Sequence, residues 1–195
     1  MTGFNDTTSA AALLATRRSG KARDMVAPGP DAAQLRAILG TAIRVPDHGK
    51  LAPWRFVTVA EDQRAALSEL MEAAYVAEKP DAGRLERDAI RGFAFEAPTL
   101  VIVLSKVNPE SHIPAWEQEL SAGAATMQLC NAAHARGFVA NWLTGWPAYA
   151  PGVLAVLAEP NERIAGYVFI GTASRGLEER PRPDYDMIVR AWQAP

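Results

Sequence analysis

The sequence predicts a protein of mixed α and β structure, in which helices pack against a central mixed sheet. Segments of helical periodicity alternate with short strand-like runs, without the regular spacing of successive βαβ units. One run, from Leu100 to Leu104, is apolar at every position, which is typical of a central strand buried on both faces. The 195 residues, 49% of them hydrophobic, suffice for one well-filled core.

Helices are predicted where an apolar periodicity follows a capping residue. Asp31 and Gln34 have the spacing of a capping box, and they open a helix that Pro46 ends. Pro114 and Gly137 mark the start and the end of the longest helix, because proline suits a first helical turn and glycine the position after the last. The predicted helices cover residues 9–18, 31–45, 62–78, 83–93, 114–136 and 153–157, and the predicted strands cover 54–59, 100–104, 138–143 and 167–170.

Nothing in the sequence divides the chain into parts. It contains no internal repeat, low-complexity stretch or linker. From Ala173 onward it carries arginine and proline without periodicity, which predicts an extended arm. We therefore expect a single domain over residues 1–195, with extended arms at 1–8 and 173–195.

The charge balance and the single cysteine exclude several classes of protein. A formal charge of −2 gives no general positive field for nucleic acid or an anionic membrane, so any bound anion must be held by a local cluster. Cys130 alone cannot form an internal disulfide and fits a reducing compartment. Arg17-Arg18 follows the apolar run 11–15, the reverse of the order in an export signal, and no segment has transmembrane length. We expect a cytoplasmic protein with no nucleic-acid or membrane partner.

Arg17, Arg18 and Ser19 form the first candidate site. Two guanidinium groups match the oxygens of a phosphate in geometry, and the serine hydroxyl adds a third donor. The same cations would also complement the dipole at the C-terminus of the preceding helix. The triplet alone leaves both interpretations open.

A second candidate is the loop that holds Arg44, Asp47 and His48. Pro46 and Pro53 each fix one backbone angle in it, so its polar side chains could be held ready for a planar polar ligand. A solvated loop histidine is the alternative.

Trp142, Leu143 and Thr144, at the end of a predicted strand, are the third candidate. An aromatic ring at this position could stack on a flat ligand, and Thr144 could bond the edge of that ligand. Packing within the core is the alternative.

Two other kinds of site find no support in the sequence. His112, Glu117 and Glu119 match no known metal-site spacing, so we expect no metal ion. No G-x-G-x-x-G motif is present, which leaves a permanently bound dinucleotide unsupported.

In their order along the chain, these motifs resemble the FMN-dependent nitroreductases, and in particular the small, compact branch of that family. The similarity extends over roughly residues 10–172. The matching blocks are Arg17–Ser19, Arg44–Trp54, Pro114–Glu119 with Ser121–Gly123, Asn141–Gly145 and Gly166–Gly171.

The resemblance implies an α+β fold with a mostly antiparallel sheet, and a domain-exchanged homodimer with FMN at the subunit interface. It assigns the phosphate and ribityl end of FMN to Arg17–Ser19, and contacts with the flavin to Arg44 and His48. Residues Trp142–Thr144 match a stretch that contacts FMN from the other subunit. No catalytic side chain is implied, because the flavin carries the chemistry.

The implied activity is the transfer of electrons from NADH or NADPH to a nitroaromatic or quinone-like acceptor, by a ping-pong mechanism on one flavin. Two alternatives stay open. One is a flavin-binding protein without turnover, and the other is a flavin enzyme of different chemistry, such as dehalogenation or flavin cleavage.

Overall fold

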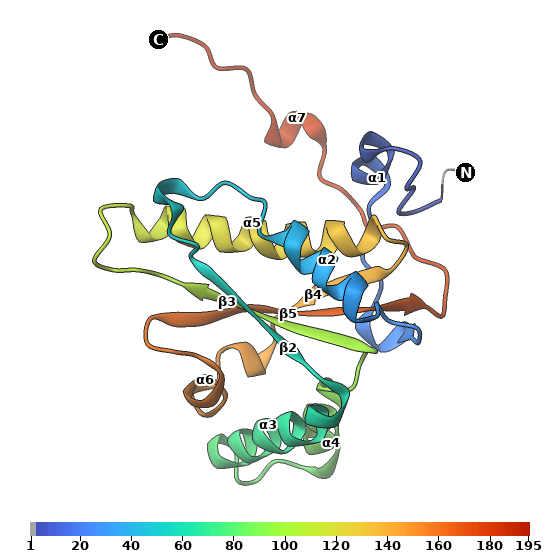
Figure 1. Cartoon of the computed structure of the whole chain (residues 1–195), viewed down its shortest axis with the longest axis vertical. Coiled ribbons are helices and arrows are strands. Elements are labelled where there is room, and N and C mark those ends of the chain that lie inside the picture. The colour runs from blue at the N-terminus through green and yellow to red at the C-terminus, as the bar shows by residue number, and fades with distance from the viewer. Residues whose placement is uncertain (1–2) are drawn as a thin grey trace.

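The structure, a computed structural model that describes residues 3–195, contains a five-stranded sheet between two groups of helices (Figure 1). β5 lies inside the sheet, paired with β3 on one side and with β4 and β1 on the other. β2 pairs with the far side of β3 and forms an edge, and all the described pairs are antiparallel. The strands are β1 (Met25–Val26), β2 (Trp54–Val59), β3 (Thr99–Lys106), β4 (Val139–Leu143) and β5 (Glu162–Ala173).

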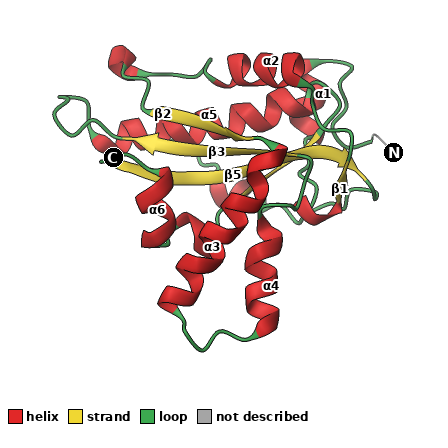
Figure 2. Cartoon of the chain, turned by 60° about the horizontal axis from the view of Figure 1, so that its bottom comes forward, coloured by secondary structure: helices red, strands yellow, loops and turns green. Residues whose placement is uncertain are grey.

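The helices divide between the two faces of the sheet. α2 and α5 cover one face, whereas α3, α4 and α6 lie on the other (Figure 1). α3 and α4 pack together and extend away from the sheet (Figure 2). The helices are α1 (Ala10–Thr16), α2 (Ala32–Ala42), α3 (Arg64–Glu78), α4 (Arg84–Phe93), α5 (Ala115–His134), α6 (Pro151–Leu157) and α7 (Tyr185–Ile188).

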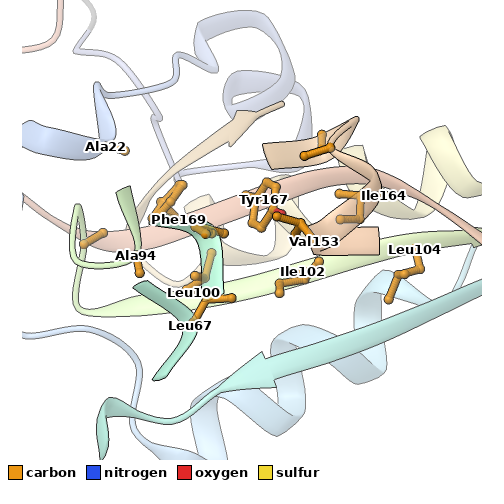
Figure 3. Close-up of a cluster of buried hydrophobic side chains, with 14 of the residues drawn as sticks. Ala22, Leu67, Ala94, Leu100, Ile102, Leu104, Val153, Ile164, Tyr167 and Phe169 are labelled. Atoms are coloured by element: carbon orange, nitrogen blue, oxygen red, sulfur yellow. The ribbon is translucent and has the colours of Figure 1, made fainter. Parts of the chain in front are cut away.

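β3 contributes to two apolar cores, because successive side chains of a strand face opposite ways. Leu100 and Ile102 lie in the core on the side of α3, α4 and α6, together with Phe169 of β5 (Figure 3). Val101 and Val103 lie in the core beneath α2 and α5. All four β3 side chains are fully buried, which confirms the predicted central strand.

β5 starts at Glu162, well before the predicted strand at residue 167, and an ion pair that no local pattern reveals joins this end of the strand to β2. The Glu162 side chain is 0% exposed, and its Oε1 accepts a hydrogen bond of 2.9 Å from Nε of Arg55 on β2. The Arg55 guanidinium also donates to the carbonyl of Leu157 at 2.9 Å, so it ties β2 and β5 to the end of α6. This hydrogen bonding lowers the pKa of Glu162 and keeps its carboxyl ionised.

The predicted class, α+β with a mostly antiparallel sheet packed by helices, is confirmed, with shifts at the ends of elements. α2 begins at the predicted capping box, in which Asp31 accepts from the N–H of Gln34 at 2.8 Å. It ends at Ala42, before the expected limit at Pro46. α5 follows Pro114 as predicted. β1 was not predicted, because two residues are too few to show a pattern.

The predicted N-terminal arm includes residues 1–2, which lie outside the described residues. Residues 3–8 fold back on the end of α1, where Asp6 N–H donates to Thr16 Oγ1 at 2.9 Å. Beyond Ala173 the chain leaves the sheet, carries the short helix α7 and is almost wholly exposed (Figure 1).

Candidate functional site

Two asparagine side chains hold the backbone of the loop after α1, residues 17–20, which we name the anion loop. Asn5 accepts from the N–H of Arg18 at 2.8 Å and donates to the carbonyl of the same residue at 3.0 Å. Asn141 of β4 donates to the carbonyl of Gly20. Sequence patterns did not identify a role for either asparagine, because the contacts join residues that lie far apart along the chain.

A small cavity lies beside the anion loop. Its lining includes the cationic residues Arg18, Lys21 and Arg175 together with the hydroxyl-bearing Ser19. Its volume is about 100 Å³. Pockets that enclose a whole ligand commonly measure roughly 300–1,000 Å³. The cavity therefore suits a group of about the size of a phosphate, and the rest of any larger ligand must lie outside it.

The cations of this cavity contact carboxylate groups and a backbone carbonyl of the same chain. Arg18 Nε donates to the carbonyl of Glu178 at 2.6 Å and lies 3.9 Å from the Glu179 carboxylate. Lys21 lies 3.5 Å from the carboxylate of Glu178. Both glutamate side chains are mostly exposed, and exposed ion pairs contribute only about 0–1 kcal/mol to stability. A bound phosphate, which would form charge-assisted hydrogen bonds with the same cations, could replace these ion pairs.

Arg17 differs from Arg18, because no ion pair to it occurs among the described residues. It is half-buried, and its guanidinium donates to Ser19 Oγ at 3.3 Å. Burial, with a smaller contribution from the positive charge of Arg17, lowers the pKa of His134 to about 4. Burial in the core also raises the pKa of Cys130 to about 12. Arg17 therefore lies near the C-terminal end of α5, beside two groups that are neutral at pH 7.

The second candidate loop is anchored to the N-terminal half of α5. His48 lies in a short 3₁₀ turn, and its Nδ1 is 2.7 Å from Oε2 of Glu117. Ser121 donates to the carbonyl of Pro46 at 2.6 Å. Asp47 accepts from the N–H groups of residues 51 and 52 at 3.0 and 2.9 Å. The loop is thus held in place around an exposed histidine.

Backbone angles in this loop agree with a held conformation. Gly49 has a φ of 77°, and the non-glycine residues Lys50 and Ala52 have φ of 55° and 46°. The left-handed region costs a non-glycine residue roughly 1–2 kcal/mol, so surrounding contacts must impose it. Such strain concentrates at functional sites.

The structure does not bring the two loops together within one chain. The anion loop lies near His134, at one end of α5, and His48 contacts Glu117, near the other end. With a rise of about 1.5 Å per residue, the 17 positions from Glu117 to His134 span about 26 Å. Arg44 is exposed at the same end as His48. One FMN molecule is shorter than this span.

The third candidate, at the end of β4, lies next to the anion loop through the contact of Asn141 with Gly20. The Trp142 indole donates to the carbonyl of Ala165 at 2.9 Å and remains 38% exposed. The Leu143 side chain packs against the core beneath α3 and α6, and Thr144 is half-buried after it.

Within residues 3–195, no three His, Cys, Asp or Glu side chains are grouped so that they could hold a metal ion. No helix in that range is long and apolar enough to cross a membrane.

Comparison with known proteins identifies relatives that belong to one family. A sequence model of the nitroreductase family matches residues 14–172. The Haemophilus influenzae protein "Putative NAD(P)H nitroreductase" is 37% identical over 172 residues, which cover 87% of this chain and 90% of the relative.

Solved structures support the same relationship at the level of the fold. A nitroreductase-like family protein from Bacillus cereus has a TM-score of 0.82 at 22% identity and covers 96% of this chain and 97% of its own. An FMN- and NADPH-dependent nitroreductase from sphigopyxis sp. strain HMH has a TM-score of 0.72 at 21% identity, with coverage of 95% and 99%. The nitroreductase-like fold predicted from the sequence is confirmed.

The contact of Trp142 with Gly166 leads to a test of the geometry beside the anion loop. A Cβ on residue 166 would lie 2.0 Å from Nε1 of Trp142, so Gly166→Ala must displace the indole. We expect the free energy of unfolding to fall by about 1–3 kcal/mol, from overpacking and the lost hydrogen bond. Urea unfolding followed by tryptophan fluorescence measures this change.

The matched control is Gly92→Ala on α4, where an added Cβ meets nothing within 4 Å and stability should be kept. An unchanged unfolding midpoint for Gly166→Ala would show that the Trp142 indole does not lie over β5.

Proposed function

The chain belongs to the nitroreductase family, and from this premise we propose that it is an FMN-dependent oxidoreductase of the cytoplasm. It takes electrons from NADH or NADPH and passes them to a nitroaromatic or quinone-like acceptor. The observation that carries the proposal is the anion loop, in which Arg18 and Ser19 line a cavity of phosphate size and Arg17 donates to the Ser19 hydroxyl.

The residues present fit FMN. Its one terminal phosphate matches the donors of Arg17, Arg18 and Ser19, and its ring system is too large for the cavity of about 100 Å³. The ring therefore extends out of the cavity, where Trp142–Thr144 of the same chain lie close by, whereas the resemblance implied a contact from the other subunit. The chemistry that FMN supplies when bound is two-electron transfer from the reduced nicotinamide to the acceptor, in two half-reactions.

Of the two loop arginines, Arg18 lines the cavity, but Arg17, which donates to Ser19, has fewer contacts to exchange on binding the phosphate. Arg17 is half-buried and needs no carboxylate to be displaced, whereas Arg18 must first exchange its contacts with residues 178 and 179. His134 beside Arg17 is neutral above its pKa of about 4, so at neutral pH it carries no charge that would repel Arg17.

We propose that Arg44 and His48 reach the flavin of a second copy of the chain, in a homodimer with FMN at the interface. Within one chain, Glu117, which contacts His48, and His134, which lies near Arg17, are separated by about 26 Å along α5, a span longer than one FMN molecule. A partner in antiparallel orientation would bring its own Arg44 and His48 to this anion loop.

Exposed apolar surfaces support the dimer. Trp116 and Leu120, one turn apart on α5, are 66% and 52% exposed. The C-terminal arm carries five more exposed apolar side chains, and a hollow beside the edge strand β2 offers apolar surface to cover. The arm residues are Tyr185, Met187, Ile188, Val189 and Trp192, and the hollow is lined by Ala32, Leu35, Arg36, Leu39, Gly40, Ile43 and Phe56. We propose that each arm wraps around the partner subunit.

The nicotinamide and the acceptor are proposed to use one site in turn, in a ping-pong mechanism. The chain has no glycine-rich βα turn that would hold the pyrophosphate of a dinucleotide at a helix N-terminus. The nicotinamide must then bind mainly by stacking, on the surface that the acceptor also requires.

The purified protein tests this function directly. We expect it to be yellow, to release FMN on denaturation and to bleach on addition of NADH or NADPH. Double-reciprocal plots at several fixed acceptor concentrations should be parallel. A colourless protein that cannot be loaded with FMN would contradict the proposed function. Intersecting lines would contradict the ping-pong mechanism and indicate a ternary complex.

Arg17→Ala should weaken FMN binding while the fold is kept. One charge-assisted hydrogen bond is worth about 1.5–3 kcal/mol, so the Kd for FMN should rise about ten- to a hundred-fold. Fluorescence titration with FMN measures the Kd. Arg84→Ala, which removes an exposed arginine at the start of α4, is the control and should leave the Kd unchanged. If the two variants bind FMN with the same Kd, Arg17 serves only to complement the C-terminal end of α1 and does not hold the phosphate.

The shared site can be tested by mixing two variants. If each flavin contacts the anion loop of one chain and His48 of the other, a heterodimer of Arg17→Ala and His48→Ala chains contains one intact site. Co-expression with two different tags should recover one tight FMN site for each heterodimer, although each parent homodimer has none. Recovery of no tight site would show that both residues serve the same chain's flavin.

A further inference from the structure

Glu117 contacts His48, and the proposed function gives it no role. Its Oε2 lies 2.7 Å from Nδ1 of His48, within the range of a charge-assisted hydrogen bond. The two side chains are 44% and 64% exposed, and an exposed pair of this kind contributes little to stability. Stability of the fold therefore does not account for the contact.

The neighbouring polar side chains of Asp47 and Gln118 are bound to the backbone, and Glu117 is the residue that binds His48. The carboxylate of the neighbouring Asp47 is occupied by the N–H groups of Leu51 and Ala52. The side chain of Gln118 is bound to the backbone of residues 108 and 113. Within residues 3–195, no other carboxylate forms a hydrogen bond or ion pair with His48.

This contact determines which ring nitrogen of His48 can bind a ligand. A neutral imidazole has one N–H donor and one acceptor nitrogen, and the partner of one nitrogen sets the state of the other. Because a carboxylate only accepts, Nδ1 must carry the proton. Nε2 is then an acceptor, on the side of the ring that faces away from Glu117.

We propose that Glu117 is a positioning residue for His48, holding the Nδ1–H tautomer and the ring orientation so that Nε2 accepts a hydrogen bond from the bound flavin. The flavin ring has one imide N–H, and its ribityl chain has hydroxyl groups, so donors of the required kind are present at its edge. The inference rests on the proposed function, since it requires His48 at the flavin.

The tautomer can be measured in the protein without FMN. At about pH 8.5, well above the ordinary histidine pKa of about 6.5, ¹⁵N NMR distinguishes the two neutral forms. Only three histidines are present, and the spectrum of His48→Ala assigns the signals of residue 48. We expect Nδ1–H in the unmodified protein and in the control Glu119→Ala, whose carboxylate faces Arg163 at 3.8 Å. Glu117→Ala should shift residue 48 toward Nε2–H. An unchanged tautomer in Glu117→Ala would overturn the proposal.

FMN affinity gives the second measurement. Glu117→Ala and His48→Ala should each raise the Kd about ten-fold, the effect of one hydrogen bond, and the double variant should be no weaker than either. Glu117→Gln keeps an acceptor oxygen and should restore part of the affinity, whereas Glu119→Ala should match the unmodified protein.

The outcomes separate the inference from the function on which it rests. An unmodified protein that binds FMN, with Glu117→Ala equally tight or with additive losses in the double variant, overturns the role of Glu117 and leaves the proposed function standing. An unmodified protein that binds no FMN overturns the proposed function, and with it the flavin contact of His48.

Discussion

The pairing of β3 with β5 is the interaction on which the other features of the structure depend. The two strands pair from Thr99 with Ile170 to Lys106 with Glu162, and most of their side chains are buried. Their alternating side chains form both apolar cores and so determine where α2, α5 and the α3–α4 pair can lie. The free side of β5 binds β4 and β1, which brings Asn141 to the backbone of Gly20. The sheet therefore positions the anion loop.

Burial and exposure are distributed along α5 in a way that suits a charged ligand. At its C-terminal end, burial lowers the pKa of His134 and raises that of Cys130, so both groups stay neutral beside Arg17. Near its N-terminal end, Glu117 and His48 are exposed and paired. The helix is long enough to keep these two regions apart, and this separation is the physical reason for proposing a site shared between two chains.

Most helices and strands could be predicted, because their patterns are local. The Asp31–Gln34 capping box, the run 100–104 and the Pro114 start of α5 each depend on neighbours within a few residues. β1 and the first half of β5 could not be predicted in this way. β1 has only two residues, which is too few to show a periodicity. From its sequence context Glu162 is expected to be exposed, and only the structure shows that Arg55, 107 positions away, binds it.

The sequence by itself determined the fold class, the order of most elements and the family, because these follow from short-range periodicity, capping and motif order. It also identified the anion loop and the loop around His48 as separate candidates. Only the tertiary structure decided that Asn5 and Asn141 hold the first loop, that residues 178 and 179 partner Arg18, and that Glu117 binds His48. The hydrogen bonds among these contacts join residues that lie 13 to 160 positions apart, and a hydrogen bond depends on distance in space, which local sequence patterns do not encode.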